Sequence, residues 1–235
     1  MMTLTFYRTL IYNDMVIIFR DKSLIGMLLL SPAFVFLVRF GLPWMDSFID
    51  LSGYHLHLLA FCTMTSVMFP AYVMSFVMLD EKDQDILTVI RVMPVGVRSF
   101  LFYRTMMVVV LSFFCAMPVL VFNPFMALPW NVVALISLIT SLTAPVLLYL
   151  IIGFADNKIE GVTFLKLANL VIVIPFLFFF INKPHAWVLA IIPVFWTYLA
   201  VVEWLSTWFY VFVLVSTVAH FVVLYLLIIR VMKKL

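Results

Sequence analysis

The sequence predicts an all-α membrane protein with six transmembrane helices, and three observations carry the prediction. The chain is 67% hydrophobic and 11% charged, whereas a soluble domain is roughly 45–50% apolar and about 25% charged. Six stretches of the sequence are apolar over the ~20 residues that a helix needs to cross a bilayer. The basic residues are concentrated in the segments that would face one side of the membrane.

The distribution of Lys and Arg predicts the topology. If the N-terminus is cytoplasmic, the termini and alternate loops carry twelve of the fourteen basic residues: Arg8, Arg20, Lys22, Lys82, Arg91, Arg98, Arg104, Lys158, Lys166, Arg230, Lys233 and Lys234. Arg39 and Lys183 are the exceptions. Cytoplasmic loops of membrane proteins are enriched in basic residues, so we expect a multi-pass protein of a bacterial-type plasma membrane with both termini in the cytoplasm. Because the positive charge is dispersed among acids, nucleic acid is not an expected partner.

The first element, residues 1–22, has the pattern of an amphipathic helix. Apolar residues recur at helical spacing from Leu4 through Tyr7 to Ile18, and polar residues occupy the other side. This pattern predicts a helix that lies in the membrane interface. Asp14 falls on the wrong flank of the apolar stripe. The alternative is a solvated helix with no role of its own.

The apolar stretches that follow define a single permease domain over residues 1–235. The predicted spans are residues 23–44, 58–79, 105–122, 131–154, a fifth that follows Lys166 and ends near Ile181, and 207–229. Residues 183–206 are also apolar, but a seventh span would place the basic C-terminus outside the cell. We therefore predict a re-entrant or interfacial helical pair on the external side, interrupted at Pro193, before the last span.

Two ionisable residues within the predicted spans are candidates for a substrate path. Arg39 lies in the first span and His220 in the last, and charged or titratable groups at membrane depth are often functional. Arg39 could instead extend to the lipid headgroups, and His220 could be a neutral side chain hydrogen-bonded to a neighbouring helix. His55 and His57 lack a third ligand nearby and lack helical ligand spacing, so no metal site is expected.

The loop at residues 80–104 predicts a short amphipathic helix. Acidic residues occupy its start, where they favour a helix N-terminus. An apolar stripe follows, and Pro94 and Gly96 end the helix. The stripe consists of Ile86, Leu87 and Ile90. A helix that exposes such a stripe can bind a partner protein or lie against lipid headgroups, and both interpretations are open.

This loop resembles the first cytoplasmic loop of type-2 ABC exporter permeases. In that family an acid precedes a Leu-rich helix, with a Pro thirteen positions after the acid, and Glu81 and Pro94 keep this spacing. Leu87 and Ile90 match the family's apolar positions. The resemblance implies that the helix inserts into a groove of a partner ATPase. The implied ATPase-coupling residues are Glu81, Asp85, Ile86, Leu87, Ile90 and Pro94.

Two further comparisons with that family concern local sequence. Asp85 and Ile86 stand where Gly-Thr is common in the family, so the local turn could differ here. The loop before Lys166 is similar to the loop between the fourth and fifth spans of a fluoroquinolone-export branch. The matching residues of this second cytoplasmic loop are Asn157, Lys158, Glu160 and Gly161.

The resemblance implies the permease subunit of an exporter. The predicted spans carry little charge and are rich in Phe, Trp, Tyr and Met, which favours an amphipathic or hydrophobic drug, peptide or lipid as the substrate. None of the six glycines belongs to a G-x-x-x-x-G-K-[ST] motif, so ATP and Mg are expected on a separate ATPase, present in two copies. A second permease subunit, identical or different, completes the implied assembly. We expect no catalytic residues in this chain. The alternatives are a secondary transporter or channel, which would need acidic residues at mid-membrane, and a membrane-embedded enzyme, which would need converging catalytic groups.

Overall fold

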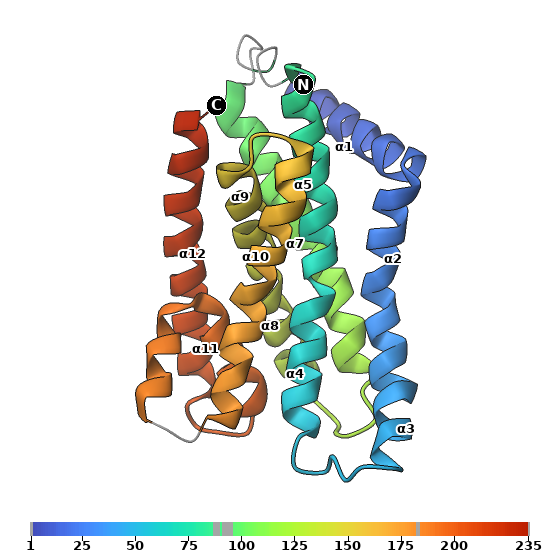
Figure 1. Cartoon of the computed structure of the whole chain (residues 1–235), viewed down its shortest axis with the longest axis vertical. Helices are drawn as coiled ribbons and strands as arrows, with labels where there is room; N and C mark the ends of the chain where they lie inside the picture. The colour runs from blue at the N-terminus through green and yellow to red at the C-terminus, as the bar shows by residue number, and fades with distance from the viewer. Residues whose placement is uncertain (1, 87–89, 91–95, 182–183, 235) are drawn as a thin grey trace.

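The computed structural model describes residues 2–86, 90, 96–181 and 184–234, and this part of the chain is helical throughout apart from short connections. Both chain ends lie at the same end of a helical bundle (Figure 1). We call this the termini end and the opposite one the far end. The helices are α1 (Met2–Arg20), α2 (Lys22–Phe36), η1 (Leu37–Gly41), α3 (Leu42–Asp46), α4 (His55–Ser66), α5 (Met68–Asp83), α7 (Gly96–Val121), α8 (Trp130–Ser141), α9 (Thr143–Phe154), α10 (Lys158–Phe176), η2 (Leu177–Phe180), η3 (Pro184–Ile191), α11 (Pro193–Val202) and α12 (Phe209–Lys234).

Six helical rods in the described part are long and apolar enough to cross a membrane, which confirms the predicted number of spans. They comprise residues Lys22–Asp46, His55–Asp83, Gly96–Val121, Trp130–Phe154, Lys158–Phe180 and Phe209–Lys233. A helix suits this setting because it satisfies its backbone hydrogen bonds internally, where lipid offers none. The third and fifth rods begin earlier than predicted, at Gly96 and Lys158, because helical hydrogen bonding continues past the point where the sequence becomes polar.

Two of the spans consist of two α-helices that meet three residues before a proline. Pro70 and Pro145 lack the backbone N–H that would bond to the carbonyl four residues earlier, and those earlier residues, Ser66 and Ser141, are the last residues of α4 and α8. The Ser66 carbonyl instead accepts a hydrogen bond from the hydroxyl of Ser31 in α2. The break in the helix therefore provides a polar contact between spans.

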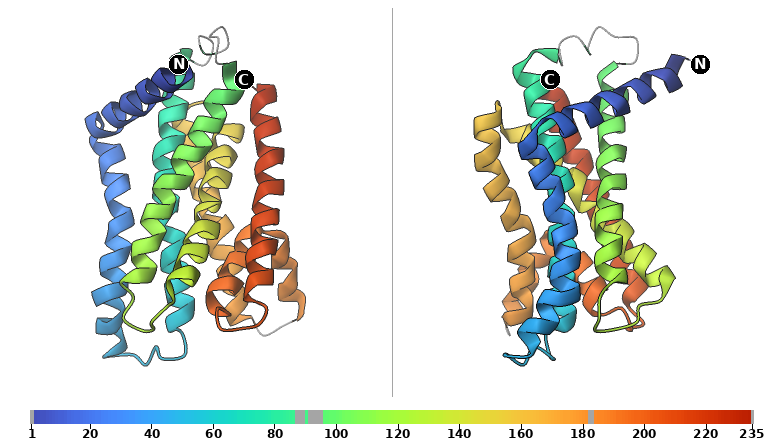
Figure 2. Two further views of the ribbon diagram at one scale, coloured as in Figure 1. Left: turned by 180° about the vertical axis from the view of Figure 1, so that it is seen from behind. Right: turned by 90° about the vertical axis from the view of Figure 1, so that its right-hand side faces the viewer.

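The centre of the bundle is formed by α5 and α9. These helices pack against each other and are largely buried, whereas the spans that contain α2, α10 and α12 are each only 17% buried. Exposed apolar faces on the outer helices suit contact with lipid. Figure 2 shows α1 crossing the termini end at a steep angle to α2. The location of α1 in a membrane interface stays a prediction.

The described residues of the segment before the last span, 184–206, form no seventh rod. It contains the 3₁₀ helix η3 and the ten-residue helix α11, which would rise only about 15 Å, half of the ~30 Å hydrocarbon layer. Most of α11 is buried, against α12, α4, α10 and α8. Its lower position in Figure 1 places it toward the far end. Whether it enters the membrane stays a prediction.

Candidate functional site

A buried ion cluster joins three helices at the termini end. Arg104 of α7 is completely buried, and its guanidinium Nη1 lies 2.7 Å from Oδ2 of Asp14 in α1. Its Nη2 pairs with Oε1 of Glu81 in α5. We call Asp14, Glu81 and Arg104 the ion triad. Since α1, α5 and α7 each supply one member, the triad fixes the N-terminal helix to the helices on either side of the loop at 84–95.

The neighbours of the ion triad only partly satisfy its polar atoms. Tyr103 donates a hydrogen bond from its hydroxyl to Asp14, and the Sδ atom of Met74 lies 3.1 Å from Arg104 Nη1. In the described part of the chain, Glu81 Oε2 and Arg104 Nε are buried without a hydrogen-bond partner. Burial raises the pKa of Asp14 above its ordinary value, and the charge of Arg104 opposes that change. Two buried carboxylates thus share one guanidinium.

A second set of ionic contacts joins the end of α5 to the connection between α9 and α10. Lys82 Nζ lies 3.0 Å from Asp156 Oδ1, and Lys158 Nζ lies 2.8 Å from Asp80 Oδ2. The backbone N–H of Lys158 also donates to Asp83 Oδ2 over 3.3 Å. The two loops that the sequence singled out are therefore in direct contact.

The predicted residues of the second loop organise the start of α10. The Asn157 side chain accepts a hydrogen bond of 2.9 Å from the backbone N–H of Glu160, and the Glu160 carboxylate accepts one of 2.9 Å from the backbone N–H of Asp156. This reciprocal arrangement satisfies backbone groups that a helix start leaves free. A Cβ added at Gly161 would lie 2.5 Å from Leu79 Cδ1, so the absence of a side chain lets α10 approach α5 closely.

The predicted coupling residues differ in exposure. Glu81 is buried in the ion triad, Ile86 is 38% exposed and Ile90 is 6% exposed. Asp85 has φ = 57°, a left-handed conformation that glycine adopts without steric cost. Asp85 therefore adopts the backbone conformation that a glycine would favour at this turn. Leu87 and Pro94 lie outside the described residues, so their predicted contacts are not placed.

The two predicted path residues lie apart from each other and from the ion triad. His220 of α12 is buried; its Nε2 is 3.0 Å from the Thr143 hydroxyl of α9, and its Nδ1 is 2.8 Å from the Ser216 carbonyl. This geometry agrees with the interpretation of His220 as a side chain that is hydrogen-bonded to a neighbouring helix. Arg39 is exposed in η1, toward the far end, and lines a cavity of about 550 Å³. A role in a substrate path stays a prediction for both.

The histidine pair near the start of α4 is split between different partners. His55 pairs with Asp46 and stacks on Phe125 at 4.0 Å between ring centroids. His57 packs edge-on against Phe179 at 4.6 Å. Within the described ranges, no group of three His, Cys, Asp or Glu side chains could hold a metal ion.

The sequence did not identify the partners of Glu81 or the ionic contacts between the two predicted cytoplasmic loops. The useful signal was present in Asp14, an acid on the flank of an apolar stripe, and in Arg104, a base at the start of a predicted span. Buried charges require partners. An acid on one apolar face and a base on another therefore predict a buried ion pair, but the sequence does not show which acid contacts which base.

A helical bundle with six membrane-spanning rods defines a multi-pass membrane protein. The sequence matches the model of the Rv2686c-like fluoroquinolones export permease proteins over residues 14–228, and the chain belongs to this family. It is 30% identical over 177 residues to the fluoroquinolones export permease protein MT2760 of Mycobacterium tuberculosis strain CDC 1551 / Oshkosh. The same values hold for the fluoroquinolones export permease protein Rv2686c of strain ATCC 25618 / H37Rv. Each alignment covers 73% of this chain and 67% of the relative. No solved structure matches the chain.

Proposed function

We propose that this chain is the transmembrane permease subunit of an ATP-driven exporter, which moves an amphipathic or hydrophobic compound out of the cytoplasm. The observation that carries the proposal is membership of a permease family whose Mycobacterium tuberculosis members are named for the export of fluoroquinolones. A fluoroquinolone is an aromatic amphiphile, so it belongs to the substrate class that the apolar composition of the chain favours.

The distribution of charge supports a cytoplasmic location for the termini end. Six spans place both chain ends on one side, and the helix ends and loops at the termini end carry basic residues from Arg8 to Lys233. Basic residues of this kind are retained on the cytoplasmic side of bacterial membranes. Export by this topology starts from the termini end.

The loop between α5 and α7 is the surface that best suits an ATPase. Exposed Asp85 and the partly exposed Ile86 lie beside each other at the start of this loop, and apolar side chains on a helix commonly insert into a partner's groove. The ion triad and the Lys82 and Lys158 pairs connect this surface to α1, α7 and α10. A movement imposed on the loop would therefore act on several spans at once.

The assembly in this proposal contains two permease subunits, identical or different, and two ATPase subunits that bind ATP and Mg. The chain has no phosphate-binding glycine motif, which supports placing nucleotide binding on the partner. The nucleotide would supply the energy, and the permease would supply the path and the cargo site.

The experiment uses inside-out membrane vesicles from bacteria that express the chain together with its candidate ATPase. We expect norfloxacin, which is intrinsically fluorescent, to accumulate in the vesicles when ATP and Mg are added, with or without a protonophore. Ile86→Asp should abolish both accumulation and co-purification of the ATPase. Ile49→Asp, at an exposed position at the far end, is the matched control and should preserve both.

Two outcomes would contradict the proposal. Accumulation driven by a proton gradient without ATP would identify a secondary transporter. Purification of the chain without any ATPase, together with unchanged transport by Ile86→Asp, would remove the role of the loop.

A further inference from the structure

Arg39 is a cation within an apolar span and has no anionic partner among the described residues. It lies in the rod Lys22–Asp46, five positions before Trp44. No carboxylate of the described chain comes within 4.0 Å of its guanidinium. Arginine at membrane depth is costly unless it is paired or reaches water. The structure therefore leaves the charge of Arg39 available to a ligand.

The nearest acids in the sequence after Arg39 are already engaged. Asp46 Oδ2 lies 3.1 Å from His55 Nε2, and Asp50 Oδ1 accepts a hydrogen bond of 3.1 Å from the backbone N–H of Ser52. These contacts direct both carboxylates toward residues other than Arg39. An external anion would meet no competing carboxylate at its guanidinium.

The cavity that Arg39 lines has the chemistry of a site for an aromatic amphiphile. Its volume is about 550 Å³, within the ~300–1,000 Å³ of small-molecule pockets. The connection between α7 and α8 forms most of its wall, with Phe125, Met126 and Trp130 among the lining residues. Figure 2 shows this connection at the far end of the bundle. The described lining contains one cation and no acid.

Asn123 keeps this wall in place. Its side-chain amide donates to the Leu120 carbonyl over 2.6 Å, and its Oδ1 accepts from the backbone N–H of Met126 over 3.0 Å. These bonds shape the connection after α7 without help from a ligand.

The backbone at Arg39 is also unusual. Residues Leu37–Gly41 form a π-helical turn, η1, between the α-helical segments α2 and α3. Such turns are rare and occur frequently at functional sites. This observation is independent of the unpaired charge and of the cavity, and it concerns the same residue.

We infer that this pocket, which the proposed topology places at the external end of the path, binds the carboxylate of the amphipathic compound before its release. Arg39 is the group that binds the anion, and the aromatic wall is the surface for the ring system. The inference rests on the proposed function for the identity of the ligand. Fluoroquinolones carry a carboxylate on an aromatic ring system, which fits one guanidinium beside Phe125 and Trp130. The phosphate of a lipid headgroup has the same charge, so the experiment separates these two sources.

The test measures binding of norfloxacin and of its ethyl ester to the purified chain in phosphatidylcholine nanodiscs, without ATP. Since a hydrogen bond to a charged group is worth about a factor of 10 or more, the wild type should bind the acid about 10-fold more tightly than the ester. Arg39→Gln should remove this preference, and Arg39→Lys should keep part of it. Arg98→Gln, at an exposed arginine near the termini end, is the control and should keep all of it.

Equal binding of acid and ester by the wild type would overturn the inference, as would a preference that survives Arg39→Gln. A parallel arm uses native mass spectrometry of nanodiscs that contain phosphatidylglycerol. If Arg39→Gln loses bound phosphatidylglycerol but keeps the acid preference, the pocket is a lipid site and the inference fails.

The binding test is independent of ATP-driven transport. Failure of ATP-dependent accumulation, with the acid preference and its loss in Arg39→Gln intact, would reject the proposed function and support the pocket. Accumulation without any acid preference would reject the pocket alone.

Discussion

Replacing Arg104 by methionine tests whether the ion triad stabilises the fold through charge compensation. The substitution leaves Asp14 and Glu81 facing each other at 1% and 9% exposure. Removing one partner of a buried ion pair costs about 3–5 kcal/mol, because the remaining charge is buried without compensation. For a chain of this size, 1 kcal/mol corresponds to about 2–4 °C in Tm. We therefore expect Arg104→Met to lower Tm by about 6–20 °C.

A compensated variant separates charge from packing. Replacing a whole buried ion cluster by apolar residues of similar volume is often neutral or stabilising. The triple variant Asp14→Leu, Glu81→Leu and Arg104→Met should therefore regain most of the lost Tm. If the triad transmits movement from the loop, this variant should still lose transport.

The assay is thermal unfolding of the purified chain in a mild detergent, followed by size-exclusion chromatography. Arg98→Met, on the same helix but at an exposed position, is the control and should change stability by less than about 0.5 kcal/mol. The reasoning is refuted if Arg104→Met melts within 2 °C of this control, a margin of about 0.5–1 kcal/mol, or if the triple variant is as unstable as the single one.

Three further substitutions test local features of the fold. Asp85→Gly should stabilise the chain by about 0.5–1 kcal/mol, since glycine removes the cost of φ = 57°; an unchanged or lower Tm would show that aspartate is not strained there. Gly161→Ala should destabilise the chain by about 1–3 kcal/mol through the contact with Leu79. The control, Gly26→Ala, has no atom within 4 Å of the added Cβ and should be neutral or stabilise by up to about 1 kcal/mol in the same melting assay. Equal effects of the two substitutions would contradict the close approach of α10 to α5. Hydrogen bonds from the first turn of α2 lower the pKa of Asp21, so the contribution of this cap to stability is complete above about pH 4 and is lost as the pH falls through the lowered pKa. Asparagine caps equally well without titrating, so the Tm of Asp21→Asn should fall less than that of the wild type between about pH 5 and pH 3. Parallel pH profiles of the two proteins would contradict the capping role.

Much of the architecture follows from the sequence because hydropathy is a local property. The six spans and the rejection of a seventh required only apolar length and the count of basic residues. The boundaries were less accurate, as at Gly96 and Lys158, since a helix continues into polar sequence while its backbone bonds persist.

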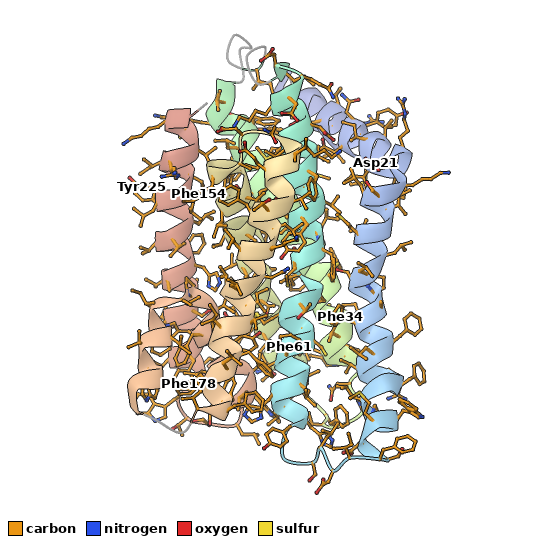
Figure 3. All side chains as sticks on the ribbon, viewed as in Figure 1. Asp21, Phe34, Phe61, Phe154, Phe178 and Tyr225 are labelled. Carbon is orange, nitrogen blue, oxygen red and sulfur yellow. The ribbon has the colours of Figure 1, made fainter. Side chains whose placement is uncertain are left out.

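The partners of the charged residues were decided by the tertiary structure. Lys158 and Asp80 are 78 positions apart, and nothing in either local sequence identifies the other. Asp14 lies on the flank of an apolar stripe because its partner, Arg104, belongs to α7. Figure 3 shows the junction of α1 and α2 near Asp21, at one edge of the termini end. The angle between these two helices brings Asp14 over the bundle.

The sequence by itself determined that the chain is a six-span membrane protein with its charge concentrated on one side, because burial in lipid depends on the composition of each segment alone. Only the tertiary structure decided that Glu81 is a member of a buried ion triad, that Ile86 is partly exposed, and that Arg39 lines a cavity without an acid. Those properties depend on how helices distant in sequence cross and pack. The free energy of a charge is set by the groups that surround it in space.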